Sequence, residues 1–219
     1  MKRTGLIISL LLLIGAIQAQ IITDKTSKKY TVGFDIYTDF VTRIPADYTP
    51  AALNPGFNVF GSYNFDLGKT PHVFAIGLGI RSHNLYSNTR IDTVYATTIV
   101  FSPIKYNYKR SKINLVYLEI PAELRFKFDN KWKLGIGFKM GLLIDSKEKY
   151  IGDIAATGPR VYEKHKRINS LEKYTYGPTL RIGYKWVSVF GYYQIGRTFK
   201  QSAGPEFKPL SIGLTISPF

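Results

Sequence analysis

The chain has 219 residues, a length that suits one barrel-sized domain and is hardly enough for two. It contains no cysteine, which excludes a disulfide framework, thiolate metal sites, a cysteine nucleophile and a lipid-modified N-terminal cysteine. Its 30 Lys and Arg residues against 15 Asp and Glu give a formal charge of +15, which points to nucleic acid only if the protein stays in the cytosol.

Residues 1–19 have the three parts of a secretory signal peptide. Two basic residues are followed by an almost unbroken apolar run over 5–17, and Ala19 is a small residue suited to cleavage. The run is short for a transmembrane helix, which needs about 20 apolar residues. We therefore expect export and a mature domain of residues 20–219, and export argues against a nucleic-acid partner.

Beyond residue 20 the dominant pattern is an alternation with a period of two, which is typical of a strand with one apolar face. It is clearest over 131–144, where Leu134 and Ile136 alternate with Lys133 and Gly135. The eight segments that share this pattern are 30–42, 55–66, 72–84, 113–128, 131–147, 172–185, 186–199 and 208–219. An even number of strands closes an antiparallel barrel with both termini on one side.

The connections between these segments alternate strictly in length. The short ones are 67–71, 129–130 and 185–186, and the long ones are 43–54, 85–112, 148–171 and 200–207. Tight periplasmic turns and long external loops are the pattern of outer-membrane barrels. We therefore predict an all-β fold, an eight-stranded antiparallel up-and-down transmembrane β-barrel in the outer membrane of a Gram-negative bacterium.

Aromatic residues gather beside the short connections. Phe128, Trp132, Tyr184 and Trp186 all lie there, and they include both tryptophans of the chain. Tyr and Trp concentrate at membrane interfaces, where one end of the ring is wet and the other is apolar. These four residues are predicted to form a periplasmic aromatic girdle.

Charged residues occupy the strand faces opposite the apolar ones, so they point into the barrel if the apolar faces meet lipid. They are Asp35, Asp39, Arg81, Glu119, Glu123, Arg125, Lys127, Lys133, Lys139 and Arg181. Eight strands enclose just enough room for side chains, and charges in such a space persist when they are paired. We expect an internal ion-pair network that stiffens the barrel, with a proton or ion path as the alternative.

The segment 117–124, Tyr-Leu-Glu-Ile-Pro-Ala-Glu-Leu, resembles the Leu-Glu-Ile-Pro segment of the PorT-like outer-membrane β-barrel proteins of Bacteroidetes-type bacteria. Residues 135–141, 176–184 and 204–214 resemble later strands of that family. The resemblance covers the C-terminal half by motif and the N-terminal half by pattern. It implies a barrel fold without implying a chemistry, and the founding member of the family is tied to a secretion system.

Three prolines interrupt the strand pattern. Pro121 and Pro178 fall inside predicted strands, where each removes a ladder hydrogen bond that lipid cannot replace. We expect bulges or strand ends at both positions. Phe219 is a terminal residue typical of outer-membrane insertion signals, but Pro218 precedes it, and it is out of phase with the apolar residues at 210, 212, 214 and 216.

The long outer loops are rich in lysine and arginine. The predicted cationic patch consists of Lys105, Lys109, Arg110, Lys112, Lys164, Lys166 and Arg167. A cationic rim that faces outward would meet the phosphates and carboxylates of lipopolysaccharide at close range. A solvated, charged loop without a partner is the alternative.

An enzyme is the least supported class of function. His72, His83 and His165 fall at a short turn, a strand end and a loop, without the spacing of a metal site, and are interpreted as solvated polar residues. We predict no catalytic residue, no metal and no cofactor. The expected function is that of a structural or interaction protein whose cationic outer loops bind another envelope component, for example of a secretion apparatus. A narrow transport path and a barrel enzyme stay as alternatives.

The signal-peptide interpretation predicts that the mature chain begins near Gln20 and fractionates with the outer membrane, because the apolar segment before it is removed on export. Intact-mass measurement of the protein from membranes checks the first point, and membrane fractionation checks the second. Recovery from the soluble periplasm would contradict the barrel interpretation, since the apolar strand faces would then lack lipid.

Overall fold

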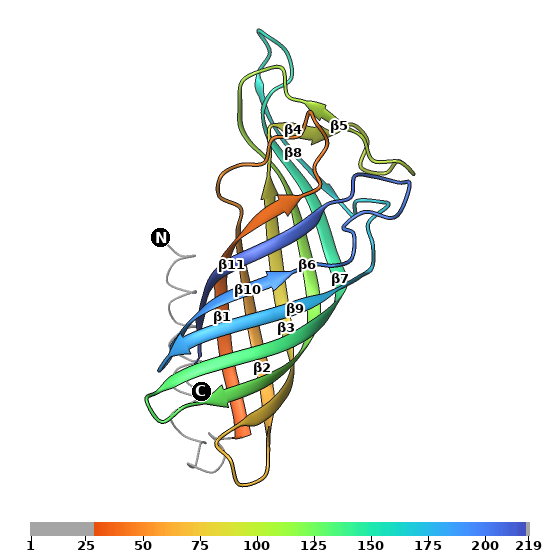
Figure 1. Cartoon of the computed structure of the whole chain (residues 1–219). Coiled ribbons are helices and arrows are strands. Elements are labelled where there is room, and N and C mark those ends of the chain that lie inside the picture. Colours follow the sequence, from red (N-terminus) through yellow and green to blue (C-terminus); the bar gives the residue numbers. More distant parts are fainter. Residues whose placement is uncertain (1–28, 218–219) are drawn as a thin grey trace, which may run out of the picture.

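The computed structural model describes residues 29–217, which form a closed antiparallel barrel of eight strands (Figure 1). The wall strands are β1 (Tyr30–Thr42), β2 (Pro55–Asp66), β3 (Val73–Tyr86), β6 (Tyr108–Lys127), β7 (Trp132–Asp153), β9 (Tyr174–Tyr184), β10 (Val187–Tyr193) and β11 (Lys208–Ile216). Their order is β6-β3-β2-β1-β11-β10-β9-β7, and the pairing of β6 with β7 closes the ring. The predicted fold class is confirmed. No helix among the described residues is long and apolar enough to cross a membrane.

The predicted signal peptide of residues 1–19 lies outside the described residues, as do Pro218 and Phe219. The short connections predicted from the sequence join β2 to β3, β6 to β7 and β9 to β10, and they lie along the lower left end of the barrel in Figure 1. Lys131 and Lys185 take φ angles of 67° and 53° in two of these turns. The left-handed region is the conformation that tight hairpin turns require.

The alternation of the sequence decides which side chains face the interior. In β1, Phe34, Ile36 and Phe40 are 42–59% exposed on the outer surface of the wall, whereas Asp35 and Asp39 between them are fully buried. Successive side chains of a strand point to opposite faces, so each wall strand contributes one apolar outer row and one polar inner row. The same division runs through the strands paired with β1.

Strands β6 and β7 continue well beyond their predicted ends, into the segments 85–112 and 148–171 that the sequence indicated as loops. The same segments contain the short strands β4 (Thr89–Ile91), β5 (Phe101–Pro103) and β8 (Arg160–Lys166). Strand β7 pairs with β9 as far as Leu142 and with β8 from Lys147 onward. A three-stranded sheet, β6-β7-β8, therefore rises above the barrel (Figure 1).

Each of the two strand prolines lies where hydrogen-bonded pairing is interrupted on one side of its strand. The β3–β6 register runs from Ile76↔Ala122 to Gly79↔Glu119 without pairing at Pro121, and the β9–β10 pairing ends at Thr179, before Pro178. On their other sides, Pro121 and Pro178 both pair with β7 in unbroken register. The expectation of a bulge or a strand end is confirmed at Pro178, where the β9–β10 pairing ends. At Pro121 neither is present, because two skipped pairs of the β3–β6 ladder accommodate the missing N–H.

All four outer loops fold inward and share one apolar cluster at the outer mouth of the barrel. Tyr48, Ile91, Ile168 and Phe207 come from the four loops in turn. They pack against inward-facing wall residues, among them Leu85, Ile113, Leu115 and Tyr117. The Tyr48 and Phe207 rings lie with centroids 4.7 Å apart. The loops are therefore not wholly solvated, and this apolar cap covers the barrel mouth.

The outer face of β7 provides a test of membrane depth. Met140 lies in the middle of the apolar row and Ile144 at its outer end, and both are more than half exposed. Met140→Arg should cost about 2–4 kcal/mol of folding free energy in bilayers, and Ile144→Arg about 0–1 kcal/mol, because the penalty fades toward the interface. Heat-modifiable gel mobility after refolding into vesicles measures the folded fraction. Equal folding of the two variants would contradict this depth assignment.

Candidate functional site

The lower part of the lumen is held by an ion-pair network centred on Glu123. Its carboxylate accepts hydrogen bonds from Arg125 Nε and from Arg181 Nη1, both at 2.7 Å. Arg181 Nη2 also donates to Asp35 Oδ2 at 3.1 Å, and Arg125 donates to Asn64 at 3.1 Å. The network joins β1, β2, β6 and β9, so it braces strands that are not neighbours in the wall.

Glu119 holds a second group of charges nearer the outer mouth. Its two carboxylate oxygens lie 2.6 Å from Arg81 Nε and 3.1 Å from Lys139 Nζ. Both cations also lie over the ring of Tyr192, at 4.2 Å for the Arg81 guanidinium carbon and 4.3 Å for Lys139 Nζ. Since all four residues are buried, these contacts offset the loss of hydration of two cations.

The sequence interpretation of His83 as a solvated residue is wrong. His83 lies two residues after the inward-facing Arg81 in β3, so it also faces the lumen, and it is 1% exposed. Its Nδ1 lies 2.6 Å from Asp39 Oδ2, and the Ser211 hydroxyl donates to Asp39 Oδ1 at 2.6 Å. Alternation counted two residues further along β3 would have found His83. No sequence signal identifies Ser211 as its neighbour.

The remaining predicted lumen residues lie at the periplasmic end. Lys127 and Lys133 face each other in the β6–β7 register, and Lys133 is buried. A cavity of about 20 Å³ beside them is lined in part by Glu123, Lys133 and Arg181. This space holds about one water molecule. Side chains therefore fill the described lumen.

The four predicted girdle residues stand at the periplasmic turns with exposed rings, between 45% for Tyr184 and 64% for Trp186. The Trp132 and Tyr184 rings lie with centroids 5.8 Å apart. The backbone N–H of Lys185 donates to the carbonyl of Lys131 at 3.0 Å, which ties two of the turns together. The aromatic side chains share one level at the end of the apolar wall.

A row of lysines crosses the sheet that rises above the barrel. In the β6–β7 register Lys112 pairs with Lys149, and in the β7–β8 register Lys149 pairs with Lys164. Lys147 pairs with Lys166 in the next row. Directly paired residues point to the same side of a sheet. We call this surface the lysine face; it consists of Lys112, Lys147, Lys149, Lys164 and Lys166.

The predicted cationic patch is divided in the structure. Lys112, Lys164 and Lys166 lie on the lysine face, with Arg110 one row above them. Lys109 falls at a register shift of β6, and Arg167 begins the turn after β8 with φ 60°. The strand register adds Lys147 and Lys149 to these patch lysines.

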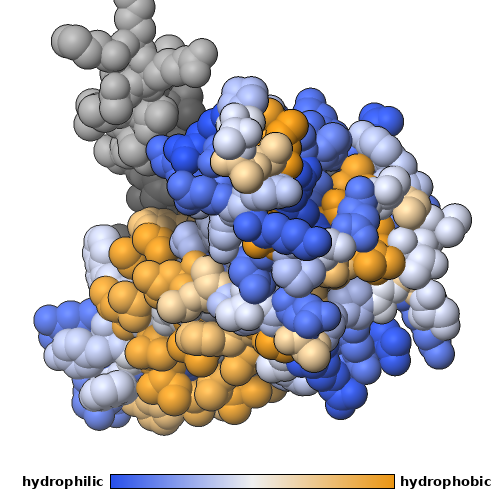
Figure 2. Space-filling view, turned by 90° about the horizontal axis from the view of Figure 1, so that it is seen from above, coloured by the Kyte–Doolittle hydropathy of each residue, from blue (hydrophilic) through white to orange (hydrophobic). Residues whose placement is uncertain are grey.

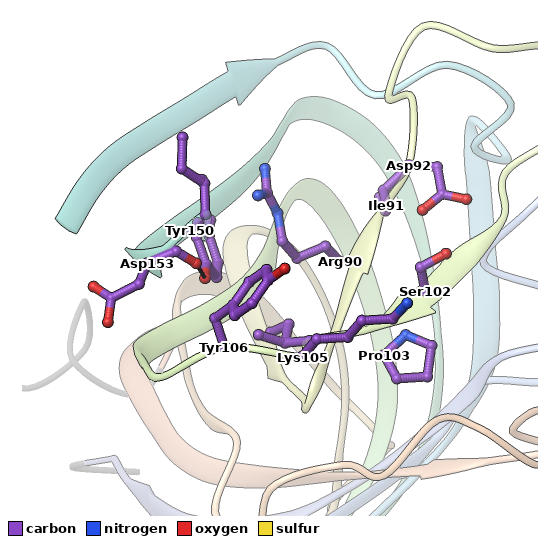
Figure 3. Close-up of a pocket in the computed structure, with 11 residues that line it drawn as sticks. Arg90, Ile91, Asp92, Ser102, Pro103, Lys105, Tyr106, Tyr150 and Asp153 are labelled. Atoms are coloured by element: carbon purple, nitrogen blue, oxygen red, sulfur yellow. Dashed lines mark hydrogen bonds between the residues drawn. The ribbon is translucent and has the colours of Figure 1, made fainter. Parts of the chain in front are cut away.

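Lys105, the last residue of the predicted patch, lines a separate cavity of about 330 Å³ (Figure 3). Tyr150 and Asp153 stand on one side of this cavity, and Asp92 and Ser102 stand on the other.

Arg90, which also lines the cavity, lies over the Tyr150 ring at 4.0 Å and forms an ion pair with Glu163. The neighbouring Ile91 N–H donates to Glu148 at 2.9 Å. Burial raises the pKa of Glu148, against the opposing effect of this hydrogen bond. These contacts hold β4 onto the inner face of the β6-β7-β8 sheet.

Comparison with known proteins identifies the family of this barrel. Residues 20–208 match the family model described as outer membrane protein beta-barrel domain. The chain belongs to this family. Its exposed apolar wall is therefore the surface that meets lipid in the outer membrane. No curated protein matches the chain.

Among solved structures, the chain is similar in fold to Ail, the attachment invasion locus protein of Yersinia pestis. Free Ail is 12% identical with a TM-score of 0.39, and the match covers 86% of this chain and 97% of Ail. Ail in complex with the heparin analogue sucrose octasulfate is 11% identical with a TM-score of 0.37, over 86% and 96% of the two chains. A mutant porin of Rh. blastica is 9% identical with a TM-score of 0.21, over 86% and 99%. At these identities the likeness concerns the fold alone.

The lumen network gives a stability prediction. The double variant Glu119→Gln, Glu123→Gln should lose at least about 3–5 kcal/mol of unfolding free energy, because it leaves buried cations without their partners. Denaturant unfolding in neutral detergent measures the loss. Glu206→Gln is the matched control, since Glu206 pairs with Lys208 and Arg197 at the outer surface and should change stability little. Equal stability of the double variant and the wild type would show that these carboxylates are not structural.

Proposed function

We propose that the protein is a non-enzymatic scaffold of a Gram-negative outer membrane, exported through a cleaved signal peptide, whose cationic outer surface binds another envelope component. One observation carries this proposal: the lumen is filled by paired charges, while lysines without ion pairs gather on the outside. Among residues 29–217, Lys149, Lys164 and Lys166 form no ion pair. Figure 2 shows the outer end from above, with hydrophilic residues over most of it.

The filled lumen argues for a scaffold over a transport path. A path for ions or protons needs charged groups that are accessible along its length, whereas Arg81, Glu119 and Glu123 are buried and paired with one another or with their neighbours. The apolar cap adds a second barrier, because Phe199 and Phe207 are fully buried at the mouth. Bare ions do not cross such a cluster without a large cost in hydration.

The geometry around His83 supports a non-enzymatic function. Both His83 and Ser211 contact Asp39, and the Ser211 hydroxyl donates its hydrogen bond to that carboxylate. A nucleophilic serine needs its hydroxyl to donate to the imidazole that removes the proton. No group of three or more metal-binding His, Asp or Glu residues occurs in the part of the chain that the structure describes.

Within the barrel family, the Leu-Glu-Ile-Pro segment of β6 supports a place among the PorT-like members. This segment contributes Glu119 to the lumen and Pro121 to the break in the β3–β6 ladder. A component of a secretion apparatus is therefore a candidate partner for the outer surface. Crosslinking in intact membranes, followed by purification of the barrel and identification of attached chains, tests for such a partner.

The sealed lumen predicts that the purified protein shows no steady conductance in planar bilayers, because eight strands filled with side chains leave no aqueous channel. Single-channel recording measures this directly. A 16-to-18-stranded porin, which encloses an aqueous channel, is the positive control for insertion. A stable, ion-selective open state of the wild type would overturn the scaffold proposal in favour of transport.

A further inference from the structure

Repulsion between the lysines of the lysine face destabilises the sheet, whereas the tip of the same β7–β8 hairpin carries an oppositely charged pair. Lys149 stands directly between Lys112 and Lys164, and like charges in direct cross-strand pairs destabilise a sheet. At the tip of the same β7–β8 hairpin, Asp153 is paired with Arg160, with Oδ1 and Nε 3.6 Å apart. The hairpin thus carries a complementary pair at its tip and an uncompensated row closer to the membrane.

The carboxylates that could compensate the row lie on the opposite face of the sheet. Glu148 accepts the Ile91 N–H, and Glu163 pairs with Arg90, so both hold β4 against the inner face. On the lysine face, Lys147 pairs with Asp145, and Lys112 donates to Asn84 at 2.7 Å. Lys149 and Lys164 have no carboxylate partner among residues 29–217.

The lysine face continues the lipid-facing surface of the barrel without turning away from it. Along β6 and β7 the last outward apolar pair is Leu118↔Leu142, and above it Val116 pairs with Asp145. The register shift between these pairs makes Ile144 the extra residue of a bulge, which keeps the outward rows aligned. The lysines therefore begin within a few residues of the hydrocarbon boundary, at the level of lipid headgroups.

We infer that the lysine face binds the phosphate groups of a phosphorylated glycolipid in the outer leaflet of the membrane. The inference deepens the proposed function by naming the anionic envelope component. Three parallel ammonium groups at the headgroup level match a phosphate that is already confined to that level by its acyl chains. The exposed Tyr174 and Tyr176 below β8 offer rings for the upper part of those chains.

An acidic partner protein fits the geometry less well than a lipid. The face looks sideways over the membrane plane, in line with the apolar wall, so its nearest neighbours are lipid headgroups. The lysines stand in two adjacent rows, which suits a compact anion with several oxygens better than an extended acidic chain.

The test compares two double variants with equal loss of charge, both made in the full mature chain. Lys149→Gln, Lys164→Gln removes the centre of the lysine face, and Lys105→Gln, Lys200→Gln removes two outer-loop lysines that are not part of it. Each folded protein in neutral detergent is titrated with lipid A that carries its phosphates, with enzymatically dephosphorylated lipid A, and with inorganic phosphate. Native mass spectrometry counts bound lipid, and thermal unfolding reports stabilisation.

Wild type and the Lys105, Lys200 variant should bind phosphorylated lipid A equally, and the Lys149, Lys164 variant about tenfold more weakly or worse. Without lipid, the Lys149, Lys164 variant should unfold at the same temperature as wild type or higher, because a like-charge pair has been removed.

Equal binding by all three proteins, equal binding of dephosphorylated lipid A, or full stabilisation by inorganic phosphate alone would overturn the inference. If lipid binding fails while crosslinking of a partner protein depends on Lys149 and Lys164, the proposed function stands and the lipid assignment falls. If neither depends on them, both fall.

Discussion

The barrel depends on the pairing of charges that its alternating strands force into the interior. A strand with an apolar face toward lipid places every second residue inside, where little water remains to hydrate a charge. The buried charge of Glu123 is compensated by ion pairs with Arg125 of its own strand and with Arg181 of β9. Arg181 also pairs with Asp35 of β1. These ion pairs replace the hydration that the buried charges lose. The same contacts also connect strands across the lumen and so brace the barrel.

Period-two alternation was enough to predict the eight wall strands, and the bounds of β1 and β2 coincide with the predicted 30–42 and 55–66. It failed where the strands leave the membrane. Above Ile144 the outward residues of β7 are Asp145, Lys147 and Lys149, so the row of exposed apolar residues ends and the segment resembles a loop. The strand continues there because β8 and β6 satisfy its backbone hydrogen bonds, a long-range pairing that local pattern does not reveal.

Some of the candidate sites could also be predicted from the alternation, and others depend on long-range strand pairing. The ten lumen charges follow from which face of each strand is apolar, and for that reason they could be named from the sequence. His83 lies inside the predicted strand 72–84 and was missed because its place near the strand end was interpreted as solvated. The cationic patch was defined by neighbours in the chain, whereas the register assembles the surface from three strands. Lys149 and Lys164 are fifteen positions apart and become direct neighbours only through the β7–β8 pairing.

The shared apolar cap restricts how the four outer loops can change in sequence and length. Outer loops of a barrel are commonly regarded as independent segments, each free to change in length and sequence. Here Tyr48, Ile91, Ile168 and Phe207 come from different loops and fill one close-packed cluster. A change of volume in one loop is felt by the other three. Exchanging a single loop with a relative should therefore fail more often than exchanging all four together, and an antibody raised against one isolated loop should recognise the folded protein poorly.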